Sequence, residues 1–297
     1  MLLFKQSQKN TINPFNNIDQ GLLDSIALKS RKSDYERYVL LGFSPFHYRQ
    51  KLLICLAFNI EIAEISKKVS EPMLANIRYQ WWRDALESSH KGEHYGHDLL
   101  KNLMPIFRSH DNLQNSLLTL IDGHEMEIEV DLPIDTNEIF NYAEKTGGIL
   151  NQLFAEILLD DEHETLEVAK YYGTLWTIIN VMKCIARKDL KTRLWLPEKQ
   201  LIKEGVEPSL ILDIKNREIL CKIVKEVLLE GQYYLSNIPT RLSGNPNARS
   251  VLLLRGIIVK ELHNFRKVNY DPFLMSSSIR PLATLVILSW WLIMRKY

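Results

Sequence analysis

Apolar residues recur along most of this chain at the spacing of an amphipathic helix. A clear case starts at Ser70-Glu71-Pro72, where Ser70 suits the N-cap and Pro72 the first turn, in which its missing N–H does little harm. The apolar positions that follow share one helical face: Leu74, Ile77, Trp81 and Ala85. We therefore expect a helix that begins here and has one apolar face.

Similar periodicity predicts further helices, which are named here by their residue ranges: 112–130, 136–157, 165–188, 209–235, 247–268 and 279–295. Thr136 is the predicted cap of the second of these helices. Alternating runs typical of strands are almost absent, so the pattern predicts an all-α protein. Gly147 and Gly148 interrupt one helix, and adjacent glycines cost roughly 1 kcal/mol each relative to alanine. We therefore expect close helix packing or a ligand to compensate at this point.

The domain organisation is simple. No linker rich in Gly, Ser or Pro divides the chain, and no internal repeat is visible. The sequence therefore predicts one domain over residues 21–297, preceded by a loosely ordered segment over 1–20.

The charge balance bears on the kind of partner, and the cysteines and the first residues bear on the compartment. The 37 basic and 36 acidic residues leave a net charge of +1, whereas a protein that binds nucleic acid through bulk charge needs a basic excess. We expect no nucleic-acid partner. The cysteines Cys55, Cys184 and Cys221 stand far apart, which is typical of a reducing compartment. The first twenty residues lack the apolar core of a secretory signal, so we expect a cytoplasmic location.

The longest apolar run, 282–294, lies near the C-terminus. A helix of this length spans about 20 Å, which is too short for the ~30 Å hydrocarbon layer of a bilayer. The pattern favours a core helix. The alternative is a helix on a membrane surface, for which Trp290 and Trp291 and the cations Arg295 and Lys296 are suited.

Acidic residues form a row at 125, 127, 129 and 131. A spacing of two puts neighbours roughly 200° apart on a helix, so the row does not share one face. We interpret it as a solvated helix end. The clusters of apparent metal ligands at 90–98 and 160–164 are interpreted as an exposed loop and a helix start.

Three groups of motifs, taken in order, carry a family resemblance. The first is DYERY at 34–38 with AFNIEIA at 57–63; the second is VSEP at 69–72 with RYQWWRD at 78–84; the third is RLWLP at 193–197. Together they resemble the squalene/phytoene synthase family from about residue 34 onward. The resemblance implies an isoprenoid synthase-like helical bundle around a central cavity.

Active members of that family join two prenyl diphosphates head to head, with Mg²⁺ held by two aspartate-rich boxes. Hard oxygen ligands hold Mg²⁺, which neutralises the leaving diphosphate. This sequence departs from that pattern at the box positions, which are Ala63, Glu64 and Lys67 for the first box and Asn180, Cys184 and Lys188 for the second. Only Glu64 among these is a carboxylate. An ammonium within ~4 Å of a divalent cation repels it by more than about 1 kcal/mol, so we expect no metal site and no cofactor.

The pattern AFN-x-E with VSE resembles a narrower branch, which contains the assembly factor of mitochondrial respiratory complex I and its bacterial relatives. This resemblance implies a non-catalytic accessory protein whose partner is a complex I subunit or a prenyl or other lipid ligand. It also implies a peripheral place on the inner membrane, or on the matrix face in a mitochondrion. We expect a set of cationic residues to bind an anionic head group: Arg49, Lys67, Arg78, Lys188 and Arg193.

Two alternatives stay open. The chain could be an active Mg²⁺-dependent transferase of farnesyl or geranylgeranyl diphosphate, with Glu61, Glu64 and Asp189 as a shifted acidic site. Asp189 is one residue off the box position. Because a helix turns about 100° per residue, its side chain is expected to point in a different direction from a residue at the box position. The other alternative is a helical module that docks on a membrane or a partner through its tryptophans, for which burial in the core is the competing interpretation.

Overall fold

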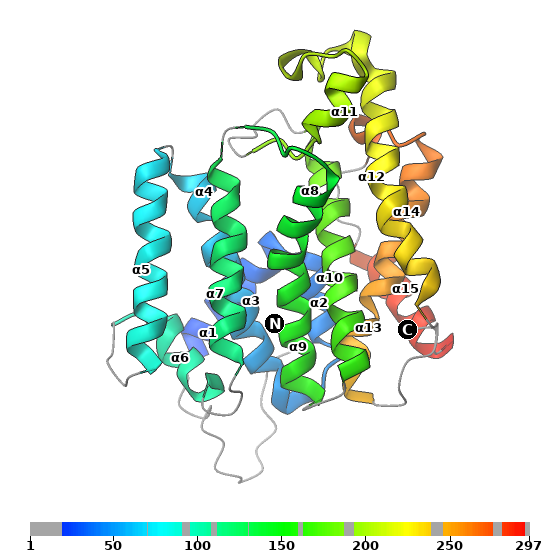
Figure 1. Ribbon diagram of the computed structural model, residues 1–297. Coiled ribbons are helices and arrows are strands. Elements are labelled where there is room, and N and C mark those ends of the chain that lie inside the picture. Colours follow the sequence, from blue (N-terminus) through cyan, green and yellow to red (C-terminus); the bar gives the residue numbers. More distant parts are fainter. Residues whose placement is uncertain are drawn as a thin grey trace.

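The computed structural model describes residues 20–69, 71–90, 96–107, 112–129, 131–159, 163–186, 193–238, 246–275 and 281–294. The regular elements in these ranges are all helical (Figure 1), which confirms the predicted all-α class. Residues 1–19 lie outside the described residues, and Gln20 already belongs to the first helix.

The α-helices range from 4 residues (α4) to 22 residues (α10). The α-helices are α1 (Gln20–Ser33), α2 (Tyr35–Leu41), α3 (Phe46–Ala63), α4 (Ile65–Lys68), α5 (Pro72–His90), α6 (Asp98–Phe107), α7 (Leu113–Glu125), α8 (Thr136–Ala143), α9 (Ile149–Leu159), α10 (His163–Cys184), α11 (Glu198–Lys203), α12 (Arg217–Asn237), α13 (Arg249–Leu252), α14 (Leu254–Lys267) and α15 (Pro281–Met294). Short turns are 3₁₀-helical: η2 (Met126–Ile128), η4 (Pro208–Leu210), η5 (Ile214–Asn216), η6 (Pro246–Ala248) and η7 (Pro272–Leu274).

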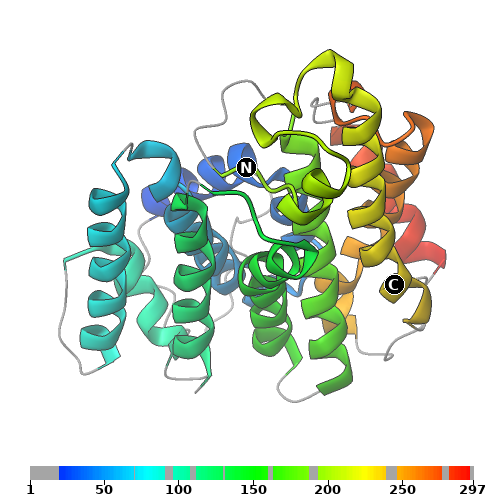
Figure 2. The ribbon, with the colours of Figure 1, turned by 45° about the horizontal axis from the view of Figure 1, so that its top comes forward.

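The core lies where α3, α7, α9 and α10 pack together. Figure 1 shows α7, α9 and α10 side by side with α3 behind them, and the contacts between these helices agree. The stretch from Leu52 to Phe58 on α3 is buried throughout, so this helix has no water-facing side along that stretch. In both views α5 covers one edge of the bundle and α15 lies at the opposite edge (Figures 1 and 2).

Helix α5 has two apolar faces, not one. Its buried face consists of Ala75, Tyr79, Trp82, Ala85 and Leu86. The residues Leu74, Ile77 and Trp81, which mark the predicted apolar face together with Ala85, are exposed. The prediction of a single apolar face is therefore wrong. The exposed apolar residues are spaced as regularly as the buried ones, so spacing alone could not tell the two faces apart.

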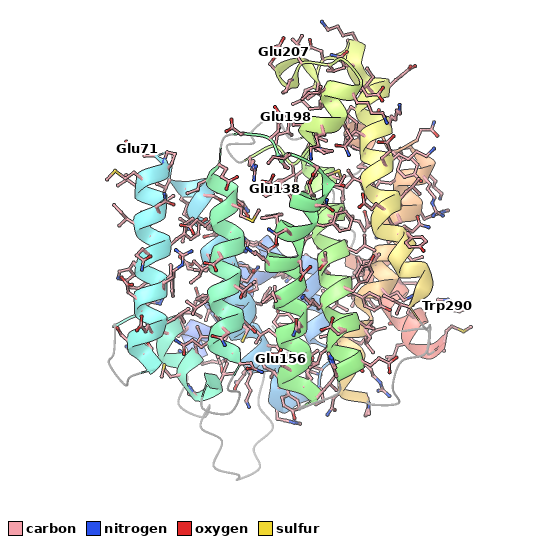
Figure 3. All side chains as sticks on the ribbon, in the orientation of Figure 1. Glu71, Glu138, Glu156, Glu198, Glu207 and Trp290 are labelled. Atoms are coloured by element: carbon pink, nitrogen blue, oxygen red, sulfur yellow. The ribbon has the colours of Figure 1, made fainter. Side chains whose placement is uncertain are left out.

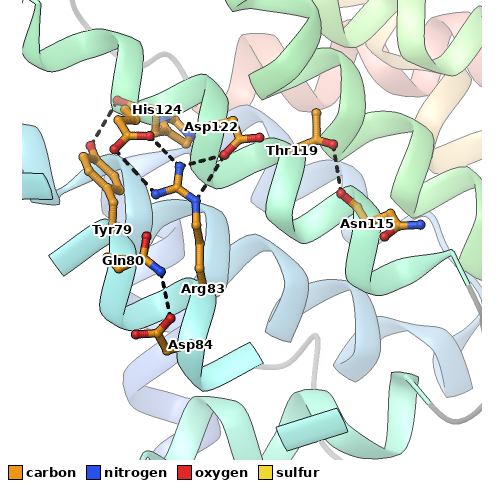
Figure 4. A network of polar contacts seen from close by, with 9 residues as sticks. Tyr79, Gln80, Arg83, Asp84, Asn115, Thr119, Asp122 and His124 are labelled. Atoms are coloured by element: carbon orange, nitrogen blue, oxygen red, sulfur yellow. Dashed lines mark hydrogen bonds and ion pairs between the residues drawn. The ribbon is translucent and has the colours of Figure 1, made fainter. Parts of the chain in front are cut away.

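Helix α5 is fastened to α7 by polar contacts as well as by its buried face. The Arg83 guanidinium donates to Asp122 at 2.7 Å and also reaches Glu125 on the next turn of α7. The Tyr79 hydroxyl donates to the carbonyl oxygen of His124 at 3.0 Å (Figure 4). These contacts fix the end of α7, which carries part of the site described below.

The paired glycines are explained by close helix packing. They belong to the π-helical turn η3 (Glu144–Gly148), which joins α8 to α9. An ideal Cβ on Gly147 would lie 1.9 Å from the Thr177 hydroxyl oxygen, and one on Gly173 would lie 2.0 Å from the Gly147 carbonyl oxygen. The predicted close packing is confirmed, and α10 supplies the partner, Gly173.

Some predicted boundaries shift. Asp135, not Thr136, caps α8, because its carboxylate accepts from the backbone N–H of Asn137 at 3.1 Å. The start of the predicted helix 209–235 forms short turns, and α12 begins only at Arg217. The predicted helix 247–268 is divided at Leu253.

The C-terminal helix α15 is only partly a core helix. Leu288 is fully buried, and Trp291 packs on Gly256 of α14. The opposite side of α15 is exposed. Within the described ranges, none of the helices combines the length and the apolar character needed to cross a membrane.

Candidate functional site

A pocket of about 460 Å³ opens where the ends of several helices meet. It is lined from α1 and α2, from α3 and α4, from α7 and η2, from α8 and η3, and from α10. Most of its lining side chains are polar or charged.

The box positions lie together on this pocket. Ala63, Glu64 and Lys67 line it from the end of α3 and from α4. Asn180 and Cys184 line it from the last turns of α10. Lys188 and Asp189 lie outside the described residues.

The carboxylates near the first box are already held by lysines. Lys29 Nζ lies 2.6 Å from a Glu61 carboxylate oxygen and 2.9 Å from a Glu64 carboxylate oxygen. Lys68 also pairs with Glu64. Burial raises the pKa of the Glu64 carboxyl, but the hydrogen bonds and charges of the two lysines outweigh it, and the pKa is lowered.

The groups at these positions do not fit Mg²⁺. Magnesium demands several oxygen ligands in near-octahedral geometry. Among the residues that the structure describes, no three His, Cys, Asp or Glu side chains come together as a metal-binding group. Glu64 forms an ion pair with Lys29, and the Lys67 ammonium, which would repel a cation, lines the same pocket.

A hydrogen-bonded group of five residues forms what we call the pocket floor: Asn59, Ser66, His124, Glu127 and Tyr142. One Glu127 oxygen accepts from the Tyr142 hydroxyl at 2.7 Å and lies 2.8 Å from His124 Nδ1. The other accepts from the Ser66 hydroxyl at 2.6 Å. The second ring nitrogen of His124 lies 3.0 Å from Asn59 Oδ1.

The electrostatics of the pocket floor keep Glu127 ionised. Burial raises the pKa of the Glu127 carboxyl, but the hydrogen bond and charge of His124, together with the nearby Lys67 ammonium, outweigh it, and the pKa is lowered. Burial and the adjacent carboxylate raise the pKa of Tyr142 well above its usual value. Tyr142 therefore stays a hydroxyl that can donate to Glu127.

Glu127 corrects the interpretation of the acidic row. It is only 7 % exposed, whereas the solvated-end interpretation placed it in water. Glu125 and Glu129 on either side are more exposed and pair with Arg83 and Arg193. The spacing of two residues already contained the signal, because it turns Glu127 to the side opposite its acidic neighbours.

The outer part of the pocket carries two exposed ammonium groups. Asp34, Glu64 and Glu127 are the acids of the lining, and each is paired with a cationic or histidine partner. The exposed lysines Lys32 and Lys67 also line the pocket; we call these two residues the pocket mouth. No ion pair joins either ammonium group to a carboxylate of the described ranges.

The remaining cationic candidates lie away from the lining. Arg49 donates through Nε to the Ser44 carbonyl oxygen at 2.9 Å. Arg78 is exposed on α5. Neither residue lines the pocket.

Arg193 does not line the pocket but supports the pocket floor through its neighbours. Its guanidinium pairs with Glu129 at 2.8 Å and Glu138 at 2.7 Å. It also lies 4.9 Å from the centre of the Trp195 ring. Trp195 in turn stacks on Tyr142, with ring centroids 3.8 Å apart. The RLWLP motif therefore supports the pocket floor, and this link could not be read from the motif alone.

The helices and the central pocket define an isoprenoid synthase-like fold. The crystal structure of a dehydrosqualene synthase in complex with ligand superimposes with a TM-score of 0.74 and 12% identity, covering 94% of this chain and 98% of that chain. The family model for squalene/phytoene synthase matches residues 30–283. The chain belongs to the squalene/phytoene synthase family.

Relatives within the family differ in how much of the chain they match. The NADH dehydrogenase (ubiquinone) complex I assembly factor 6 of Mus musculus is 22% identical over 264 residues, which cover 88% of this chain and 79% of the relative. The 15-cis-phytoene synthase of Enterobacter agglomerans is 21% identical over 138 residues, which cover 46% of this chain and 47% of that enzyme.

Proposed function

We propose that this chain is a non-catalytic family member that assists the assembly of respiratory complex I. We further propose that its pocket holds an anionic, phosphate-bearing lipid or prenyl group without a metal ion. The observation that carries the proposal is the chemistry of the box positions. They lie on one pocket and include Ala63, Lys67 and Cys184 in place of Mg²⁺ ligands.

The state of the remaining carboxylates supports a non-catalytic role. The alternative transferase needs Glu61 and Glu64 free to bind Mg²⁺. Both are instead within 3 Å of the Lys29 ammonium, and the pKa of Glu64 is lowered by that contact. Freeing them for a metal would require breaking these ion pairs and would leave Lys29 close to the cation.

The relatives support the assembly role over the transferase role. The similarity to the complex I assembly factor extends over 88% of this chain, against 46% for the phytoene synthase. Because the longer match includes both sets of box positions and the pocket floor, it bears on the site as well as on the fold.

The pocket mouth supports an anionic ligand. Lys32 and Lys67 face the pocket while every acid of the lining is paired. Ammonium groups bind phosphate oxygens directly through charge-assisted hydrogen bonds. In this proposal, the two ammonium groups hold the phosphate directly, without a metal ion.

The assembly role is tested by removing the protein from its host. Cells that lack it are expected to lose assembled complex I on native gels, together with NADH:ubiquinone activity, while their squalene and carotenoid content stays unchanged. Re-expression of the wild-type chain and of Glu64→Gln is expected to restore complex I equally, because Glu64 has no metal to hold.

Two results would contradict the assembly role. Loss of an isoprenoid hydrocarbon with complex I intact, or a product from farnesyl or geranylgeranyl diphosphate that requires Mg²⁺ and disappears in Glu64→Gln, would establish the transferase instead.

A further inference from the structure

Helix α15 presents an apolar face to water. Its inner side, with Thr284 and Leu288, is buried. Its outer side is made of exposed residues that share one face: Leu285, Val286, Ser289, Trp290, Ile293 and Met294. Val286 is 68 % exposed, Trp290 61 % and Ile293 74 %. Figure 3 shows Trp290 at the outer edge of the bundle.

This face differs from an ordinary water-facing helix surface. Residues 281–294 contain no charged side chain, and Ser289 is the one polar residue on the outer side. A helix that faces solvent normally carries charged or polar residues on that side. The outer side of α15 is therefore a candidate contact surface.

The exposed ionic side chains of the helix that packs against α15 are cationic. On α14, which packs against α15, the acid is Glu261, and it is buried and paired with Lys183 at 3.0 Å. The exposed ionic side chains of α14 are Arg266 and Lys267. Two further cations, Arg295 and Lys296, directly follow α15 in the sequence. An apolar helix flanked by cations complements an anionic lipid surface.

We infer that the outer side of α15 lies in the surface of an anionic phospholipid bilayer. The helix has 14 residues, about 21 Å at the α-helical rise, so it lies in the interface and does not cross the ~30 Å core. A protein partner would need matched polar groups, since interfaces carry about one hydrogen bond per 100–200 Å². The outer side of α15 offers a single hydroxyl, whereas lipid chains need none.

The inference is independent of the pocket, and it is tested by sedimentation with vesicles. The full chain is mixed with vesicles of phosphatidylcholine alone, or with vesicles of equal parts phosphatidylcholine and phosphatidylglycerol. The wild-type protein is expected to sediment with the anionic vesicles and to bind the neutral ones more weakly. Val286→Gln/Trp290→Gln/Ile293→Gln is expected to lower the partition by at least about tenfold, because three apolar side chains no longer enter the interface.

Helix α5 supplies a matched control. Met73→Gln/Leu74→Gln/Ile77→Gln removes the same number of exposed apolar side chains at the opposite edge of the bundle and is expected to bind vesicles like the wild type. Thermal unfolding by circular dichroism checks that both variants are folded.

Three results would overturn the inference. The first is a wild-type protein that sediments with neither vesicle. The second is an α15 variant that binds as well as the wild type. The third is a wild-type dimer in light scattering that the α15 variant converts to a monomer, which would assign the face to a second copy.

Discussion

The pocket floor and the pocket mouth differ in how their polar groups are satisfied. In the floor, Glu127 receives three partners within 2.8 Å and is almost completely buried. In the mouth, Lys32 and Lys67 are exposed and line the pocket without a described ion-pair partner. The floor therefore contributes to the stability of the fold, whereas the mouth is where we propose that a ligand binds.

The floor also holds the walls of the pocket in place. The Glu127 carboxylate joins η2 to α4, α7 and α8, and His124 extends the network to Asn59 on α3, so the floor positions the walls of the pocket. Ala63, Lys67 and Cys184 lie at box positions on the same pocket, and we propose that they replace metal ligands there without disturbing those walls.

The largest effect is expected in the floor. Glu127→Ala leaves the Ser66 and Tyr142 hydroxyls and the His124 ring without their buried acceptor, and should lower the free energy of unfolding by about 3–5 kcal/mol. The matched control is Glu125→Ala, which removes a more exposed carboxylate two residues away and should cost less than about 1 kcal/mol. Urea unfolding measures both, and equal losses would contradict the assigned role of the floor.

The second largest loss of stability is expected at the crossing of α10 and η3. Gly173→Ala puts a Cβ 2.0 Å from the Gly147 carbonyl oxygen, so the crossing of α10 and η3 must open. We expect a loss of about 1–3 kcal/mol in unfolding free energy. Gly96→Ala, where a Cβ meets nothing within 4 Å, is the control. A Gly173→Ala protein as stable as the wild type would show that this crossing is not tight.

The floor should also give stability a pH dependence. The pKa of Glu127 lies below its ordinary value of 4.5 in the folded protein. Its ionised form therefore stabilises the fold above the unfolded pKa, and that contribution is lost as pH falls through the folded pKa. Urea midpoints of the wild type and Glu127→Gln, measured from pH 7 downward, should converge in acid. A gap that widens in acid would mean that the pKa is raised.

The smallest effect on stability is expected at the mouth. Lys67→Gln should change the unfolding free energy by no more than about 0.5 kcal/mol, because the side chain is exposed. It should nevertheless weaken pyrophosphate binding by about tenfold, the loss of one charge-assisted contact. Lys68→Gln, next in sequence but paired with Glu64 and outside the lining, should bind pyrophosphate like the wild type. Equal weakening in both variants would point to a general charge effect.

The sequence predicted the fold class and the place where the boxes meet. The fold class followed from periodicity, and the box positions followed from the family resemblance that the motifs carry. Five box positions do line one pocket. The paired glycines also announced a close contact, although their partner Gly173 could not be known before the helices were assembled.

The floor and the helix faces could not be predicted in the same way. Glu127 is the buried member of a row of acids whose other members are more exposed, and the row was interpreted as a whole. On α5 the exposed residues Leu74 and Ile77 are as regularly spaced as the buried Ala75 and Tyr79. Periodicity identifies an apolar face, but which neighbour covers it depends on contacts distant in sequence.

The central claim is that the pocket binds phosphate groups without metal. Calorimetric titration of the full chain with pyrophosphate, with Mg²⁺ and with a chelator in its place, tests it most directly. The account predicts binding that is as tight in the chelator as in Mg²⁺ and that is weakened by Lys67→Gln. Binding that requires Mg²⁺ and is abolished by Glu64→Gln would contradict it and would restore the metal site.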